Sequence, residues 1–150
     1  MPLSPLVRKD NTFRVSAVLL GAGAWDVAPT EVGVPGAEEL LLYCAYTRGG
    51  AGGAVDMHVE ASPYSVDHGT LQNWHRLMVR QVGAFAVGAD VDAAVQRDGE
   101  ITYEATGANR EGFVLGAYGL AGSVERIRVG CAESGAAGTP GTMHIIGVMR

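Results

Sequence analysis

The chain has 150 residues, a length typical of one domain with an enclosed hydrophobic core. Its hydrophobic fraction of 47% excludes a disordered chain, and no apolar run approaches the roughly 18 residues that span a bilayer. The net charge of −5, with only 11 Lys and Arg scattered along the chain, argues against nucleic-acid binding, and we expect no membrane partner.

The first residues predict an extended arm. Pro2, Pro5 and a charged stretch at residues 8–10 show no sustained hydrophobic period, and no signal peptide is expected. We therefore divide the chain into an arm over residues 1–14 and a single domain over residues 15–150. Glycine accounts for 22 of the 150 residues, and because glycine weakens helices and supplies turns, we expect short strands.

The first half of the domain predicts three strands. Residues 13–20 are rich in Val and Leu, whereas residues 25–37 are rich in turn-forming Pro and Gly. Residues 40–47 are apolar at both alternating sets of positions, which predicts a central strand whose second face meets another sheet or another subunit. Residues 55–60 alternate apolar with polar side chains, and we expect them to pair with residues 40–47 as a hairpin.

The second half contains one ambiguous segment and several clearer strands. Residues 71–82 fit a helix by one spacing and a strand by another, and we favour a strand over 74–79 because its neighbours are strands. Clear strands are predicted at 101–106, 124–131 and 142–149. With roughly seven or eight strands and no long helix between them, the sequence predicts an all-β domain, a β-sandwich of jelly-roll type with an extended N-terminal arm.

No arrangement of residues typical of catalysis is found. The glycine clusters lack the Lys-Ser/Thr ending of a phosphate-binding loop, and Cys44 and Cys131 lie in apolar patterns expected to bury them as thiols. We therefore predict no enzyme, no cofactor and no metal. One alternative stays open: His58, His68 and His75 fall within one stretch beside carboxylates, and a metal-dependent jelly-roll enzyme would use them as ligands.

Several short motifs follow one another from residue 40 onward. They are LLLYCAYTRG at 40–49, VDMHVEASP at 55–63, Trp74, VERIRV at 124–129 and GTPGT at 138–142. In this order they resemble a group of small bacteriophage virion proteins, the capsid decoration or auxiliary proteins with a jelly-roll body. The chain departs from that group after Ser-Pro, where a longer segment replaces a short Asp-Gly turn, and before residue 40, where no motif matches.

The resemblance implies a virion structural protein, made in the host cytoplasm and bound to the outer surface of a phage capsid. It implies a homotrimer that stabilises the shell by clamping neighbouring major capsid proteins. The arm would then bind the capsid, with Leu3, Leu6 and Phe13 as apolar anchors and Arg8 and Arg14 as charges at the rim.

Two pairs of residues complete the predicted sites. Leu41 and Tyr43, on the second apolar face of the segment 40–47, are candidates for the interface between subunits. The alternative function is a carbohydrate- or surface-binding β-sandwich module of a phage tail or baseplate. In that case Tyr64 and Trp74 would stack on sugar rings.

Overall fold

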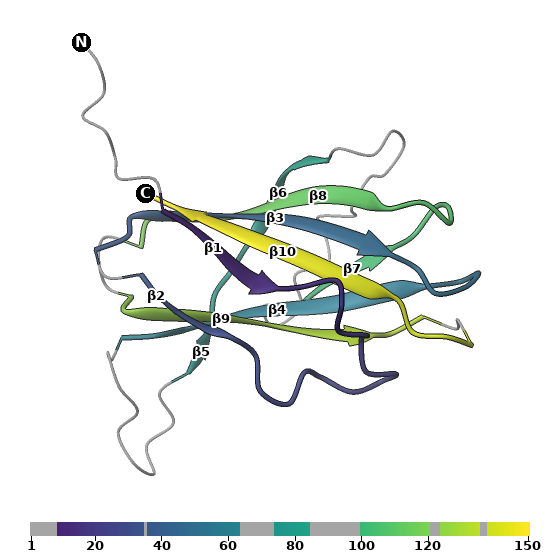
Figure 1. Ribbon diagram of the computed structural model, residues 1–150. Coiled ribbons are helices and arrows are strands. Elements are labelled where there is room, and N and C mark those ends of the chain that lie inside the picture. The colour runs from purple at the N-terminus through teal and green to yellow at the C-terminus, as the bar shows by residue number, and fades with distance from the viewer. Residues whose placement is uncertain (1–8, 35, 64–73, 85–99, 121–123, 136–137) are drawn as a thin grey trace.

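The computed structural model describes residues 9–34, 36–63, 74–84, 100–120, 124–135 and 138–150. These residues form two antiparallel β-sheets that lie face to face, with no helix among them (Figure 1). The predicted all-β class and the sandwich of two sheets are therefore confirmed. Within the same residues, no helix long and apolar enough to cross a membrane is found.

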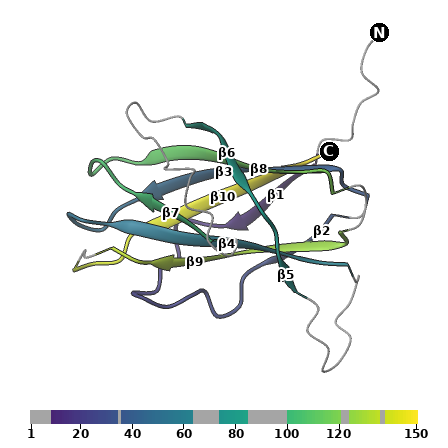
Figure 2. The same ribbon diagram turned by 180° about the vertical axis from the view of Figure 1, so that it is seen from behind.

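In the described part of the chain, each sheet contains five strands, and sheet B branches at β4. Sheet A consists, in order, of β1 (Lys9–Arg14), β10 (Thr142–Met149), β3 (Glu39–Thr47), β8 (Glu111–Tyr118) and β6 (Arg80–Ala84). Sheet B consists of β2 (Glu31–Gly33), β9 (Arg126–Glu133) and β4 (Ala54–Ser62), and β4 then pairs with both β5 (His75–Arg76) and β7 (Glu100–Glu104). Figure 2 shows the chain crossing from β5 in sheet B to β6 in sheet A.

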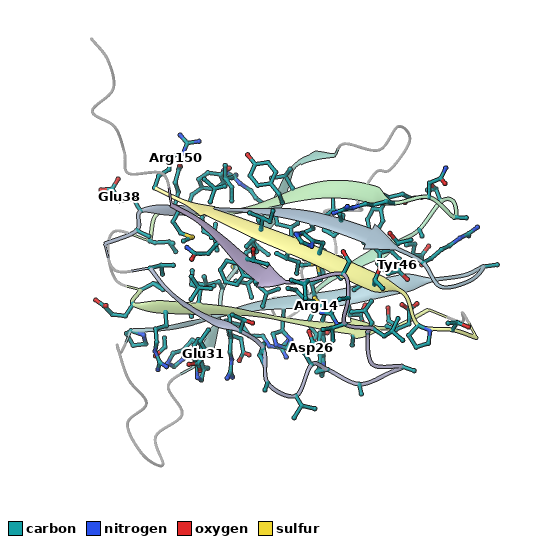
Figure 3. The ribbon with its side chains drawn as sticks, in the orientation of Figure 1. Arg14, Asp26, Glu31, Glu38, Tyr46 and Arg150 are labelled. Atoms are coloured by element: carbon teal, nitrogen blue, oxygen red, sulfur yellow. The ribbon has the colours of Figure 1, made fainter. Side chains whose placement is uncertain are left out.

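Alternation along the central strands builds the core. On β3, burial alternates residue by residue, so that Leu40, Leu42, Cys44 and Tyr46 point between the sheets. Sheet B contributes Val55, Met57, Val59, Ile127, Val129 and Cys131 to the same core. Figure 3 shows these layers filled with side chains, with Tyr46 near one end of the sandwich and Arg150 near the other. Burying each large apolar side chain contributes about 1.5–3 kcal/mol of stabilisation.

Most predicted strands are confirmed, but one predicted pairing is wrong. The segments 40–47, 55–60, 101–106, 124–131 and 142–149 correspond to β3, β4, β7, β9 and β10. The predicted hairpin does not form, because β3 pairs with β10 and β8 whereas β4 pairs with strands of the other sheet. The glycine-rich loop between β3 and β4, with Gly52 at a φ of 79°, connects the two layers instead.

The start of the chain also differs from the prediction. The strand expected at 13–20 begins and ends earlier, as β1, and residues beyond Arg14 form a turn and an isolated bridge from Leu19 to Thr142. β1 pairs with β10 from Lys9 to Arg14, with an irregularity after Thr12. Six residues of the expected arm therefore belong to sheet A, and the rest of that arm, residues 1–8, lies outside the described residues.

Short strands were predicted poorly. Of the strand expected at 74–79, only His75 and Arg76 form a strand, β5, and the next strand, β6, begins at Arg80; the described part of the ambiguous segment holds no helix. The turn-rich segment 25–37 contains β2, which was not predicted. Three residues are too few to show a period of two, although Val32 of β2 is buried between the sheets.

Candidate functional site

The outer face of sheet A is apolar and almost uncharged. The outward positions of its three central strands are Glu39, Leu41, Tyr43, Ala45 and Thr47 on β3, Thr142, His144, Ile146 and Val148 on β10, and Gly112, Val114, Gly116 and Tyr118 on β8. Glu39 is the one acidic residue among these positions, and Arg150 pairs with it at 2.9 Å. Arg80 of β6 lies over the ring of Tyr118, with its guanidinium carbon 4.9 Å from the ring centre, so this face is mainly apolar with charged side chains at its edges.

A hollow of about 330 Å³ lies on this face, lined by Tyr43, Ala45 and Ile146 together with Arg110 and His144. Leu41 and Tyr43, predicted for a subunit interface, lie half-buried on the outward side of β3, so the structure places both beside this hollow or on its wall. Ile146, with 36% of its surface exposed, was not predicted, although its outward position follows from the alternation along β10.

The predicted arm residues divide into two groups. Leu3, Leu6 and Arg8 lie outside the described residues. Phe13 and Arg14 lie on β1 and are both buried, which differs from the exposed position expected of anchors in an arm. Their side chains point between the sheets, because the irregularity in β1 turns two successive side chains inward.

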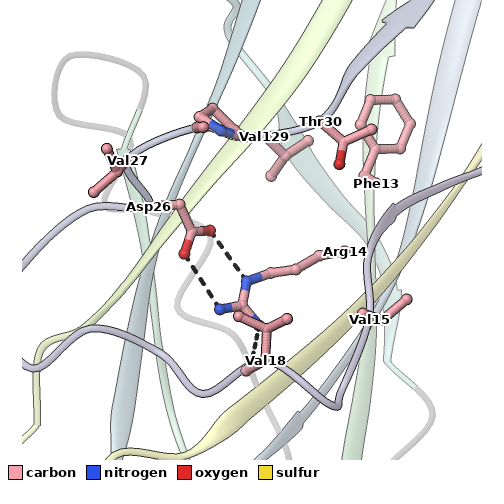
Figure 4. Close-up of a pocket in the computed structure, with 10 residues that line it drawn as sticks. Phe13, Arg14, Val15, Val18, Asp26, Val27, Thr30 and Val129 are labelled. Atoms are coloured by element: carbon pink, nitrogen blue, oxygen red, sulfur yellow. Dashed lines mark hydrogen bonds and ion pairs between the residues drawn. The ribbon is translucent and has the colours of Figure 1, made fainter.

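Arg14 fixes the loop that follows β1 (Figure 4). Its guanidinium forms a bidentate pair with Asp26, at 3.1 and 3.2 Å, and also donates to the carbonyl oxygens of Val18 at 2.8 Å and Met143 at 3.1 Å. Asp26 accepts a further hydrogen bond from the backbone N–H of Cys131 at 3.2 Å. These bonds tie β1, the loop and β9 together, and the two opposite charges compensate each other on the wall of a pocket of about 240 Å³.

The outer face of sheet B is charged, and its side chains pair with one another. Trp74 lies against two arginines of β9, with its ring centre 4.1 Å from the guanidinium carbon of Arg128 and 5.0 Å from that of Arg126. Arg126 pairs with Glu31 and Arg128 with Glu60, each at 3.1 Å. Trp74, a predicted stacking residue, is therefore half-buried in a row of planar groups, whereas Tyr64 lies outside the described residues.

His58 of β4 lies next to Glu60 on the same outer face of sheet B. Its Nε2 lies 3.1 Å from a carboxylate oxygen of Glu60, and the ring of Trp25 covers it with 4.3 Å between ring centres. Gly130 on β9 leaves room for the imidazole, because a Cβ there would lie 2.5 Å from Nε2. Burial lowers the pKa of His58 from its usual 6.5, although the Glu60 carboxylate acts in the opposite direction.

Metal and thiol chemistry find little support in the described part of the chain. There, no group of three or more His, Cys, Asp or Glu side chains is placed to hold a metal ion. His58 and His75 lie on different strands, and His68 is outside the described residues. Cys44 and Cys131 are free and buried, and burial raises the pKa of both thiols, the opposite of what an activated nucleophile needs.

Two buried glutamates were missed by the sequence analysis. Glu133 is the last residue of β9, and its side chain is buried. Its carboxylate accepts hydrogen bonds from the backbone N–H groups of Ala54 and Gly141, each at 3.1 Å, and lies 2.9 Å from the hydroxyl of Tyr46. It joins strands of both sheets to the loop before β10. The alternation along β9 places Glu133 on the inward face of the strand. This position could have predicted its role, because a buried charge needs several hydrogen bonds.

Glu111 plays the same part at the start of β8. Its carboxylate accepts from the hydroxyl of Tyr103 and from the backbone N–H groups of Thr106 and Gly107, the latter at 2.7 Å. Burial alone would raise the pKa of Glu111, but these hydrogen bonds outweigh it and lower the pKa. Both glutamates therefore hold turns in place, and backbone N–H groups of these turns occupy their carboxylates.

Comparisons with protein-family models, with curated proteins and with solved structures found no match to this chain.

Proposed function

We propose that this protein is a non-enzymatic virion subunit that binds the outer surface of a phage capsid as a homotrimer, in which the outer face of sheet A packs between the subunits. The observation that carries the proposal is the contrast between the two outer faces. Sheet B presents charges that pair with one another, whereas sheet A presents apolar side chains around a hollow. A face whose outward positions are mainly apolar gains more from burial against another protein than a face of paired charges does.

The strand order supports a jelly-roll assignment within this proposal. Setting aside β5 and β6, the remaining strands can be numbered 1 to 8 along the chain, and the two sheets then read 1-8-3-6 and 2-7-4-5. That is the order in which a jelly roll arranges two interlocked Greek keys. β1 is the first strand of this order, so an arm that clamps major capsid proteins would consist of residues 1–8, with Leu3, Leu6 and Arg8 as its contacts.

The apolar face is large enough to form the centre of one interface, although not the whole of it. Three strands of eight or nine residues, at about 3.3 Å per residue and about 4.8 Å apart, present roughly 26–30 by 14 Å. A stable interface takes about 800 Å² from each partner, so this face supplies about half of one. Nearby exposed apolar residues, Val15, Val18 and Leu19, would extend it at the edge formed by β1.

The test is the mass of the purified chain in solution, measured by light scattering. We expect three times the chain mass of 15.6 kDa for the unaltered protein and a single chain mass for Ile146→Arg. The arginine would place an unpaired charge at the centre of the buried face, which costs several kcal/mol. Co-sedimentation with undecorated capsids then tests the capsid partner.

Met78→Arg is the matched control, because Met78 is also an exposed apolar residue, with 78% of its surface accessible, and lies off this face. It should leave the trimer intact. A monomeric unaltered protein, or an Ile146→Arg variant with the unaltered mass, would contradict the proposed packing of this face between subunits.

A second candidate function, a carbohydrate-binding module of a tail or baseplate, is favoured by one observation. Trp74 is half-buried on the outer face of sheet B and is surrounded by planar, hydrogen-bonding groups. Aromatic rings flanked by such groups are common in sugar sites.

Under this second function, Trp74→Ala should abolish binding on a glycan array, since stacking on the indole would supply most of the contact area. Thr102→Ala, on the exposed outer side of β7, is the control and should bind as the unaltered protein does. Absence of any glycan binding by the unaltered protein would remove this candidate.

A further inference from the structure

His58 is enclosed by groups from every element around it. On its own strand lie Asp56 and Glu60; β9 presents Arg128, β7 presents Glu100 directly opposite His58, and β5 presents Arg76. The loop after β1 contributes Trp25, which covers the imidazole, and the neighbouring Asp26, which pairs with Arg14. The imidazole is therefore held between a charged sheet and an aromatic cover.

The hydrogen-bonding partners of His58 determine which nitrogen carries the proton. Nε2 lies 3.1 Å from Glu60, and because a carboxylate only accepts hydrogen bonds, Nε2 must be the donor in the neutral ring. Nδ1 is buried and has no hydrogen-bond partner. As a lone-pair acceptor, this nitrogen carries no proton that would need a partner.

Protonation changes this arrangement. It would place an N–H on Nδ1, a charged donor enclosed without an acceptor, which is far more costly to bury than an unused lone pair. The imidazole has no room to move toward β9, because the backbone of Gly130 lies directly beneath it. Displacing Trp25 would let water reach Nδ1, and no such rearrangement is needed while His58 is neutral.

We propose that Trp25 and His58 form an acid-sensitive latch, in which neutral His58 keeps the Trp25 ring closed on sheet B and protonation releases this ring. The loop that carries Trp25 also carries Asp26, whose carboxylate holds Arg14 of β1 and the N–H of Cys131. Opening the latch therefore loosens the anchor of the first strand. This goes beyond the proposed function, since it makes the attachment of β1 depend on pH.

The direction of the effect follows from the pKa of His58. Closure lowers this pKa below 6.5, so the closed form binds the proton less well than the open form does. As the pH falls through 6.5 and below, the equilibrium shifts toward the open form, and above 6.5 the closed form keeps its full stability.

Trp25 itself reports the opening. In a Trp74→Phe background it is the only tryptophan, and phenylalanine keeps an aromatic ring against the arginines. We expect acrylamide quenching of Trp25 to rise between about pH 7.5 and about pH 5, the range in which histidine titrates. The midpoint should lie below 6.5, and the transition should vanish in Trp74→Phe/His58→Gln, where glutamine still donates to Glu60.

Quenching of Trp25 that does not change with pH would overturn the latch, and so would the same transition in the His58→Gln variant. A direct NMR titration of the His58 ring gives a second readout that needs no variant at this position. A midpoint at or above 6.5 there would also overturn the proposal, whereas one below 6.5, together with the loss of quenching change in His58→Gln, would support it.

Discussion

Replacing Glu133 with alanine is expected to lower the free energy of unfolding by about 3 to 5 kcal/mol. The change removes the acceptor for two buried backbone N–H groups and for the hydroxyl of Tyr46. Each buried donor left without a partner costs about 1–3 kcal/mol, and the loop before β10 loses its attachment to β9. Urea unfolding with linear extrapolation measures the loss.

Two variants control this result. Glu104→Ala makes the same change at an exposed position of β7 and should alter stability by less than about 0.5 kcal/mol. Glu133→Gln keeps one carbonyl acceptor and should fall between alanine and the unaltered protein. If Glu133→Ala were as stable as Glu104→Ala, water would be replacing the carboxylate, and Glu133 would not be what closes this end of the sandwich.

The strand β4 shows both what a sequence pattern can predict and what it cannot. Alternation along a strand assigns each residue to a face, and it placed Val55, Met57 and Val59 correctly between the sheets. It also placed His58 on the opposite, wet face. It could not show that Trp25, from a distant loop, covers this histidine, because burial on an outer face depends on contacts between segments far apart in the chain.

Sheet membership was harder to predict than strand position. The strands β3 and β4 are adjacent in sequence and each shows a clear pattern, yet they lie in different sheets. A hairpin and a connection between layers have the same strand patterns and differ in the path of the loop. The apolar outer face of β3, by contrast, could be predicted, because its side chains are apolar at both sets of alternating positions.

Replacing Phe13 with alanine is expected to lower the free energy of unfolding by about 3 to 5 kcal/mol, the usual cost of emptying a buried phenylalanine site. Only 2% of the Phe13 surface is exposed, and its ring lies over Gly147 of β10, where an added Cβ would be 2.2 Å from Cε2. The ring therefore fixes β1 to sheet A through packing as well as through strand pairing. Urea unfolding of the isolated chain again measures the effect.

This experiment separates two roles for Phe13. A capsid anchor would leave the isolated chain equally stable when it is removed, as we expect for Val15→Ala, because Val15 follows β1 directly and is 45% exposed. A core residue would destabilise the chain without any partner. Gly147→Ala adds a second criterion: it should be strongly destabilising beside Phe13 and much less so in the Phe13→Ala background, since the added methyl then enters the vacated space. Additive effects of the two changes would mean that the ring and the glycine do not touch, and β1 would then be held by its backbone pairing alone.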